Sequence, residues 1–241
     1  MKNGTVKRMT REEYIKSLFA TYSLAGVLSD KNSCKVLRLR NKASNRCLVL
    51  RSLPRHSEAY EVLCGIRCEN LPEIYDAIDT SDGQIVLEEY IDGITVAQVM
   101  EGGRYRYHGA KRVLTCVCQA LTVMHQRGLV HRDVKPENVM ISSDGRVVLI
   151  DFNASRTVSA ACKDTVIMGT VGYASPEQLG IAQSDARTDI YAAGILLNVM
   201  LTGKHPTEVF AKGHAGRVVK KCTALNPDDR YQSAEGLTKA L

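Results

Sequence analysis

Polar side chains that could transfer a phosphoryl group are concentrated in one short stretch of the chain. The segment 131–138 reads His-Arg-Asp-Val-Lys-Pro-Glu-Asn, which brings Asp133, Lys135 and Asn138 into one loop. Asp151 follows a short apolar run that predicts a buried strand. Phosphoryl transfer from a magnesium nucleotide needs a carboxylate to accept the proton of the attacking hydroxyl, a cation beside the moving phosphoryl group, and oxygen donors for the metal. The spacing therefore predicts a catalytic loop, a short hairpin and a carboxylate at the end of a strand.

The composition is that of a globular protein, because 44% of the 241 residues are hydrophobic and 24% are charged. This length fits one large domain or two small ones. No apolar run approaches the ~20 residues that a membrane helix needs, and the charged start of the chain lacks the pattern of a secretory signal. We therefore expect a cytoplasmic protein with no membrane partner.

The formal net charge of +6 is unevenly distributed along the chain. The stretch 31–55 holds eight basic residues and no acidic one. Such a run is typical of a solvated strand face, or of a surface that meets phosphates or an acidic partner. Few aromatic side chains are interleaved for base stacking, so we expect no nucleic-acid partner.

The first part of the chain has the pattern of an antiparallel sheet with one helix. Five strand-like runs, separated by turn-prone residues, cover 25–28, 35–39, 47–53, 73–78 and 84–90. Apolar residues at helical spacing, with Ala59, Leu63 and Ile66 among them, predict a helix over 56–68. Residues 10–25 carry mixed signals and fit either an initial helix or a strand.

From about residue 95 the pattern becomes helical. Further helices are predicted over 109–127, 185–202, 214–225 and 232–241. The segment 154–176 has no regular period and is rich in Ser, Thr and Gly, which is typical of a functional loop. We therefore expect a small β-rich part, a hinge and a larger helical part, with a ligand bound between the two parts.

The catalytic-loop sequence and the Asp-Phe pair at 151–152 resemble the catalytic loop and the metal-binding motif of serine/threonine protein kinases of the compact bacterial type. The resemblance implies an α+β, two-lobed protein-kinase-like fold. The domain would cover residues 1–241, with an N-terminal lobe at about 10–88, a hinge at 89–93 and a C-terminal lobe at 94–241. It also implies ATP with Mg²⁺ or Mn²⁺ as cofactors, and a protein substrate that is phosphorylated on Ser or Thr.

The resemblance assigns a role to each polar residue of the loop. Asp133 would act as the catalytic base, and Lys135 would lie near the transferred phosphate. Asn138 completes the catalytic set and, together with Asp151, would hold the metal. The residues assigned to ATP binding are Val36, Val49, Arg51, Glu89, Met140 and Asp151.

Other residues match positions that brace the active site in the family. Thr170 would hydrogen-bond the catalytic base and its neighbouring lysine. Glu177 would pair with Arg230, because a buried carboxylate needs such a partner. Asp189, on an apolar helix, would accept backbone N–H groups from the catalytic loop.

Arg132 precedes the catalytic base and would pair with a phosphorylated activation loop. Thr157, Ser159 and Thr165 are candidate phosphate acceptors, because phosphate adds about two charges and suits an arginine fork. The alternative is that these hydroxyl groups only solvate a loop.

The N-terminal part departs from the family pattern at the phosphate-binding positions. The stretch 29–36 stands where the family has a glycine-rich loop, yet it contains no glycine. Arg51 stands where the family has a lysine, and the exchange changes the shape of the cation. Ala59 occupies the position of the family's partner glutamate, so we expect Arg51 to pair with Glu58 or Glu88 instead.

Asn153 replaces the glycine that follows Asp-Phe in the family, and asparagine tolerates left-handed backbone, so Asp151 is still expected to be oriented. The departures leave a second function open, a catalytically weak or inactive kinase-like module (pseudokinase) that acts through protein contacts. A small-molecule kinase is a third alternative, which the peptide-site residues 170–177 disfavour. The oligomeric state is not predicted.

Overall fold

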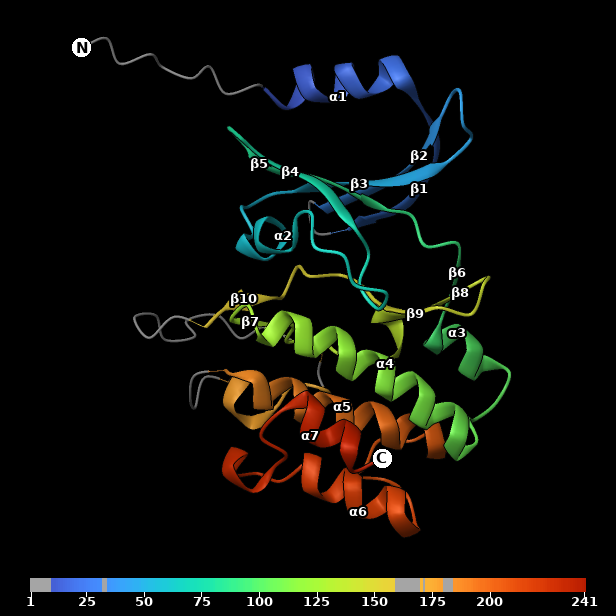
Figure 1. The fold of residues 1–241 in the computed structure, drawn as a ribbon, viewed down its shortest axis with the longest axis vertical. Coiled ribbons are helices and arrows are strands. Elements are labelled where there is room, and N and C mark those ends of the chain that lie inside the picture. The colour runs from blue at the N-terminus through green and yellow to red at the C-terminus, as the bar shows by residue number, and fades with distance from the viewer. Residues whose placement is uncertain (1–9, 32–33, 159–169, 171, 180–183) are drawn as a thin grey trace, which may run out of the picture. The chain divides into compact units, whose positions relative to one another are not determined.

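The computed structural model of the chain describes residues 10–31, 34–158, 170, 172–179 and 184–241. The chain divides into two compact units (Figure 1). Unit 1 contains Met1–Arg67 and Glu73–Tyr90, and unit 2 contains Cys68–Pro72 and Ile91–Leu241.

Unit 1 is built on a five-stranded antiparallel sheet with the strand order β1-β2-β3-β5-β4. Its strands are β1 (Tyr22–Lys31), β2 (Cys34–Asn41), β3 (Cys47–Leu53), β4 (Ile74–Thr80) and β5 (Gly83–Glu89). All five predicted strands are present, and β1 is longer than its sequence pattern indicates. Two helices, α1 (Arg11–Thr21) and α2 (Glu58–Leu63), lie on opposite faces of this sheet (Figure 1).

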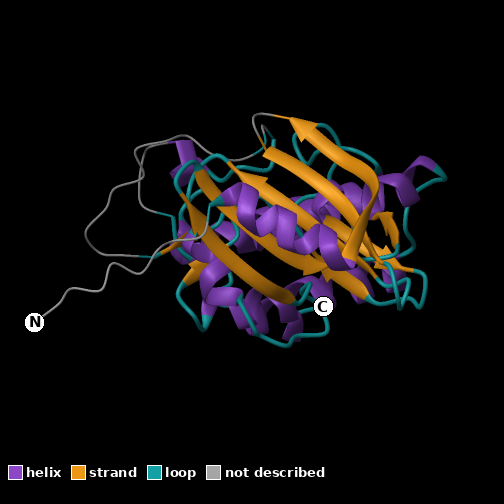
Figure 2. Cartoon of the chain, turned by 90° about the horizontal axis from the view of Figure 1, so that it is seen from above, coloured by secondary structure: helices purple, strands orange, loops and turns teal. Residues whose placement is uncertain are grey.

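Helix α1 accounts for the mixed signals of residues 10–25, because a capping box starts it and β1 follows it directly. The Thr10 hydroxyl accepts the Glu13 N–H (3.2 Å), and the Glu13 carboxylate accepts the Thr10 N–H (2.8 Å). Tyr14 is buried against leucine and isoleucine side chains of the sheet, and its hydroxyl donates to Asp76 Oδ2 (2.9 Å). Figure 2 shows α1 lying across the strands.

Helix α2 is shorter than predicted, because it ends at Leu63 although the apolar spacing continues to Ile66. Cys64 leaves the helical conformation and forms a β-bridge with Ile74. Gly65 then adopts a φ of +71°, which glycine reaches without a steric penalty. The prediction of a helix reaching residue 68 was wrong because Ile66 keeps the helical spacing but lies beyond this turn.

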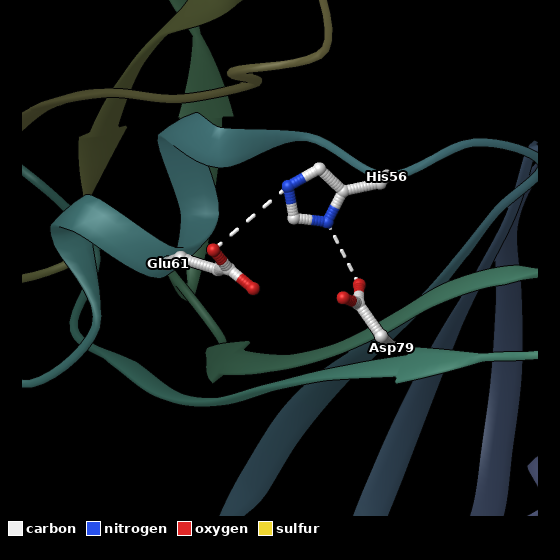
Figure 3. A group of neighbouring side chains, drawn as sticks. All are labelled: His56, Glu61 and Asp79. Atoms are coloured by element: carbon white, nitrogen blue, oxygen red, sulfur yellow. Dashed lines mark hydrogen bonds and ion pairs between the residues drawn. The ribbon is translucent and has the colours of Figure 1, made fainter.

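His56 joins α2 to the sheet through two carboxylates (Figure 3). Its Nδ1 lies 2.8 Å from Asp79 Oδ1 on β4, and its Nε2 lies 3.8 Å from Glu61 Oε2 on α2. The buried Gln84 amide lies against the same ring, with its Nε2 3.3 Å from His56 Nδ1. The hydrogen bond with Asp79 raises the pKa of His56, against the opposing effect of burial.

We expect His56→Gln to destabilise the protein at about pH 5.5 and to have little effect at about pH 8.5. The folded-state pKa of His56 lies above its unfolded value, so the protonated ring stabilises the fold below the unfolded pKa, and this stabilisation is lost as pH rises through the folded pKa. Because the side chain is 42% exposed, solvent screening should limit the loss to about 0.2–1 kcal/mol. Urea unfolding at both pH values measures it, with the exposed His108→Gln as a control. Equal losses at both pH values would contradict the expectation.

Unit 2 is mainly helical, with short strands that carry its loops. Its helices are α3 (Val96–Glu101), α4 (Tyr107–His125), α5 (Ala186–Thr202), α6 (Gly213–Cys222) and α7 (Ala234–Lys239), and its short 3₁₀ helices are η1 (Pro136–Asn138), η2 (Pro176–Leu179) and η3 (Pro227–Asp229). Its strands are β6 (Gly93–Thr95), β7 (Leu129–Val130), β8 (Val139–Ser142), β9 (Val147–Leu149) and β10 (Arg156–Thr157). β8 pairs with β6 and β9, and β7 pairs with β10. The two closing helices are shorter than predicted.

Helix α5 is the central helix of unit 2 and packs against α4 and α6 (Figure 1). Gly194 permits the close approach of α6, because a Cβ atom there would lie 2.3 Å from the Cβ atom of Cys222. The helix ends at Gly203, whose φ of +72° provides a left-handed cap, a conformation that glycine adopts easily. Among the helices that the structure describes, none is long and apolar enough to cross a bilayer.

Candidate active site

The catalytic-loop side chains meet in one hydrogen-bonded cluster in unit 2. Lys135 Nζ donates to Asp133 Oδ2 (2.7 Å) and to Thr170 Oγ1 (2.5 Å). The Thr170 hydroxyl donates to Asp133 Oδ1 (2.7 Å), and Asn138 Nδ2 donates to Asp133 Oδ2 (2.8 Å). The contacts expected of Thr170 with the aspartate and the lysine are therefore present, and donors fix both oxygens of the Asp133 carboxylate.

Asp133 is held in its ionised form. Burial raises its pKa, but hydrogen bonds from Lys135, Thr170 and Asn138, with the Lys135 charge, outweigh burial and keep the pKa below its ordinary value. At neutral pH the group is therefore a carboxylate that can only accept hydrogen bonds. Its side chain remains 15% exposed, so a hydroxyl group of a ligand can reach it.

Asp189 fixes the backbone of the catalytic loop from within α5. Its fully buried carboxylate accepts the His131 N–H at Oδ2 (2.8 Å) and the Arg132 N–H at Oδ1 (2.8 Å), as expected. Arg132 has a φ of +69°, a left-handed conformation that costs a non-glycine residue roughly 1–2 kcal/mol. The two hydrogen bonds hold this strained residue in place. His125 Nε2 also lies 2.8 Å from Asp189 Oδ2, a contact that the sequence did not reveal.

Gln178 is a supporting residue that the sequence analysis did not identify. Its Nε2 donates to the Arg132 carbonyl (2.9 Å), and its Oε1 accepts the Ser175 N–H (3.0 Å). The side chain is buried in η2, directly after Glu177. This position next to a predicted structural residue was the signal in the sequence that could have identified Gln178. Arg132 is therefore held at its N–H by α5 and at its carbonyl by η2.

The contact of Arg132 with a phosphorylated activation loop stays a prediction. Thr157 lies in β10, opposite Leu129 of β7. Ser159 and Thr165 lie outside the residues that the structure describes.

Asn138 and Asp151 offer oxygen donors suited to a divalent metal. The Ile150 N–H donates to the Asn138 carbonyl (2.8 Å), which ties η1 to the segment that carries Asp151. The left-handed backbone conformation occurs at Asp151 itself (φ +69°). It does not occur at Asn153, the residue that the sequence analysis expects to tolerate it. Asn153 instead donates its N–H to Asp151 Oδ1 (3.4 Å). A carboxylate and an amide oxygen are the hard donors that Mg²⁺ prefers, so this pair fits the ion.

In unit 1, three of the predicted nucleotide-binding residues share one face of the sheet. Val36 on β2 lies opposite Arg51 on β3, and Val49 lies opposite Glu88 on β5. Opposed residues project to the same face, as do residues two apart in one strand. All four side chains are buried, so an apolar surface surrounds one cation and one carboxylate.

Glu89 and Met140 are further predicted ATP-binding positions, and they belong to different units. Glu89 ends β5, and its Oε2 accepts the Glu73 N–H (3.2 Å). Met140 lies on β8 opposite Val148. Their contacts with ATP stay predictions.

Arg51 pairs with Glu88, which confirms the expectation that one of two carboxylates would accept it. Arg51 Nε donates to Glu88 Oε1 (2.7 Å), and the two side chains are only 9% and 5% exposed. The alternative carboxylate, Glu58, is exposed at the start of α2. Because β3 and β5 are neighbouring strands, the sheet itself positions both members of the Arg51–Glu88 pair.

Replacing Glu88 with alanine is expected to lower the free energy of unfolding by about 3–5 kcal/mol, because the Arg51 charge would stay buried without this carboxylate. Urea unfolding measures the loss. Glu88→Gln keeps the size of the side chain and should recover part of it. Glu12→Ala removes an exposed glutamate from α1 and serves as the matched control. Equal free energies of unfolding for Glu88→Ala and Glu12→Ala would show that the Arg51–Glu88 pair does not stabilise the fold.

Glu177 and Arg230 form a second buried ion pair, as expected from the sequence. Arg230 Nη1 and Nη2 donate to Glu177 Oε1 (2.6 Å) and Oε2 (2.9 Å), and the Thr188 hydroxyl donates to Glu177 Oε1 (3.0 Å). Arg230 also donates to the carbonyls of Ala224 (2.8 Å) and Arg187 (3.0 Å). The pair therefore ties η2 to α5 and to the chain that follows α6.

Residues 29–238 match the family model described as the protein kinase domain. The chain belongs to this family. Serine/threonine-protein kinase PknB of Mycolicibacterium smegmatis is 32% identical over 200 residues, which are 68% of this chain and 32% of that protein. Serine/threonine-protein kinase PknL of Mycobacterium tuberculosis is 41% identical over 139 residues, which are 56% of this chain and 35% of that protein. The chain spans about a third of the length of these curated relatives.

A solved structure confirms the predicted fold. The crystal structure of the Mycobacterium tuberculosis PknI kinase domain matches with a TM-score of 0.71 and 23% sequence identity, covering 92% of this chain and 95% of that chain. The α+β, two-lobed protein-kinase-like fold and the resemblance to bacterial serine/threonine kinases are thereby confirmed.

Proposed function

We propose that the chain is a serine/threonine protein kinase, which transfers the γ-phosphoryl group of ATP to hydroxyl groups of protein substrates. The observation that carries the proposal is the cluster of an ionised Asp133 with Lys135 and Thr170. Its similarity to proteins named serine/threonine-protein kinases supports the same activity. We further propose a cytoplasmic location.

In this proposal, Asp133 orients the substrate hydroxyl and receives its proton. The hydroxyl oxygen forms a bond to the γ-phosphorus while the bond to the β-phosphate oxygen breaks, and ADP leaves with that electron pair. Lys135 places a positive charge 2.7 Å from Asp133, where it stabilises the transferred phosphoryl group. Asn138 and Asp151 would hold Mg²⁺, which neutralises phosphate charge when bound. Arg51 would supply a cation for the other phosphates.

Labelled ATP tests the proposal directly. The purified chain is incubated with ATP, Mg²⁺ or Mn²⁺ and a generic basic protein, and the labelled amino acids are identified after hydrolysis. We expect phosphoserine or phosphothreonine from the wild type and none above background from Asp151→Ala. No incorporation, together with no stabilisation by ATP, would support a binding module instead. Saturating ATP at ~100 times its Kd should stabilise a nucleotide-binding protein by ~2.7 kcal/mol.

A further inference from the structure

An apolar hollow of about 430 Å³ opens on the surface of unit 2, between the start of α4, the end of α5 and the start of α6. Its apolar walls are formed by Leu201, Val209, Phe210, Ala211 and Ala215. Val209 and Phe210 are 46% and 41% exposed, and they are adjacent in the chain. Two large apolar side chains in one hollow form a patch, whereas single exposed apolar residues are common on any surface.

Buried hydrogen bonds hold the walls of this hollow in place. Asn198, fully buried in α5, donates to the carbonyls of Lys204 (2.9 Å) and Val209 (2.8 Å), and its Oδ1 accepts the Ala211 N–H (2.8 Å). Helix α6 closes against the same loop, because a Cβ atom at Gly216 would lie 2.1 Å from the Ala211 carbonyl oxygen. The exposed apolar side chains are therefore carried by a fixed backbone, and the hollow is preformed.

The surroundings of the hollow are strongly basic. Arg104, Lys212 and His214 line it, and none of the lining residues that the structure describes is acidic. The segment 102–112 carries four basic residues and no acidic one, and the segment 203–221 carries five basic residues and one acidic residue. All nine of these lysine and arginine residues are exposed. Two of them, Arg104 and Lys212, line the hollow, whereas Lys204 is paired with Glu208 (3.4 Å). The lining cations place positive charge beside an apolar centre, where it attracts negatively charged groups.

We propose that this hollow is a docking site for an acidic segment of a protein partner, which inserts one large apolar side chain. A buried apolar anchor within a charged rim is the arrangement in which few residues supply most of the binding energy. The basic rim complements carboxylates that flank the anchor and disfavours basic segments. The site goes beyond the proposed catalysis, because binding here uses none of the residues of the Asp133 cluster.

Fluorescence anisotropy with labelled peptides tests the docking site in the absence of nucleotide. The probe is a short peptide with one central phenylalanine flanked by glutamates. One control peptide replaces the phenylalanine with serine, and the other replaces the glutamates with lysines. We expect the probe to bind about tenfold or more tightly than either control. Its affinity should also fall with added salt, which shortens the screening length from ~10 Å at 0.1 M to ~3 Å at 1 M.

Variants of the chain assign the binding to the hollow. Phe210→Ser and Lys212→Glu should each weaken probe binding about tenfold. Arg217→Glu changes the net charge by the same amount as Lys212→Glu, but Arg217 does not line the hollow, so this variant should weaken binding less. Thermal unfolding confirms that each variant is folded, and phosphorylation of the generic basic substrate should stay unchanged, which separates docking from catalysis. Probe binding that is absent, or equal in Phe210→Ser and wild type, would overturn the proposal. Binding of palmitate alone, lost in Phe210→Ser, would assign the hollow to a lipid instead.

Discussion

Asp133→Asn is expected to lower kcat/KM for phosphoryl transfer by about 10²–10⁴-fold, the usual contribution of a positioned proton acceptor. Asparagine has almost the same size, but its amide cannot take up the proton of the attacking hydroxyl. It also presents an N–H₂ group where Lys135 or Thr170 now donates to a carboxylate oxygen. The measurement is the initial rate of incorporation of labelled phosphate at several substrate concentrations.

The matched control for this variant is Asp144→Asn, which makes the same change in the exposed turn between β8 and β9. Its rate should equal that of the wild type. Because the pKa of Asp133 lies below its ordinary value, the wild-type rate should show no acidic limb from this residue between about pH 5 and 8. A fully active Asp133→Asn protein would remove this residue from the mechanism.

Arg230→Ala is expected to lower the free energy of unfolding by about 3–5 kcal/mol, a large share of the ~5–15 kcal/mol that stabilises a typical domain. The change removes both hydrogen bonds to Glu177 and the bonds to three backbone carbonyls, those of Ala224, Arg187 and Leu225. It also leaves the Glu177 carboxylate buried without its cation. At about 2–4 °C per kcal/mol, Tm should fall by about 6–20 °C.

Arg217→Ala, an exposed arginine in α6, is the matched control and should change Tm little. Arg230→Lys keeps the charge but not the two parallel hydrogen bonds to Glu177, so it should recover only part of the loss.

Burial raises the pKa of Glu177, yet Arg230 keeps this pKa below its ordinary value. The pair therefore stabilises the wild type above the unfolded pKa, and this contribution is lost as pH falls through the folded pKa. A loss of stability no larger than that of Arg217→Ala would contradict this account.

The sequence was most informative where function depends on neighbours in the chain. Asp133, Lys135 and Asn138 fall within six residues, so their types and spacing already place them in one loop. Resemblance to the family predicted that Thr170 and Asp189 would hydrogen-bond the loop, and these hydrogen bonds are present.

The sequence was less informative where geometry depends on strand pairing or on turns. The choice between Glu58 and Glu88 as partner of Arg51 required the pairing of β3 with β5, which brings together residues 37 apart in the chain. The length of α2 depended on the turn at Gly65, although the apolar spacing continued beyond it. The docking hollow could not be predicted, because it depends on Asn198, whose side chain holds a loop through bonds that no local pattern encodes.

The carboxylate of Asp189 also sets an order in time for the growing polypeptide. The catalytic loop at His131 and Arg132 emerges 58 and 57 residues before the side chain that shapes it. Until Asp189 has been synthesised and α5 has packed, the hydrogen bonds to the N–H groups of His131 and Arg132 cannot form, although Gln178, which binds the Arg132 carbonyl, has already been made. A nascent chain would therefore carry Asp133, Lys135 and Asn138 well before it could arrange them, and the loop would reach its final form only after α5 has been synthesised.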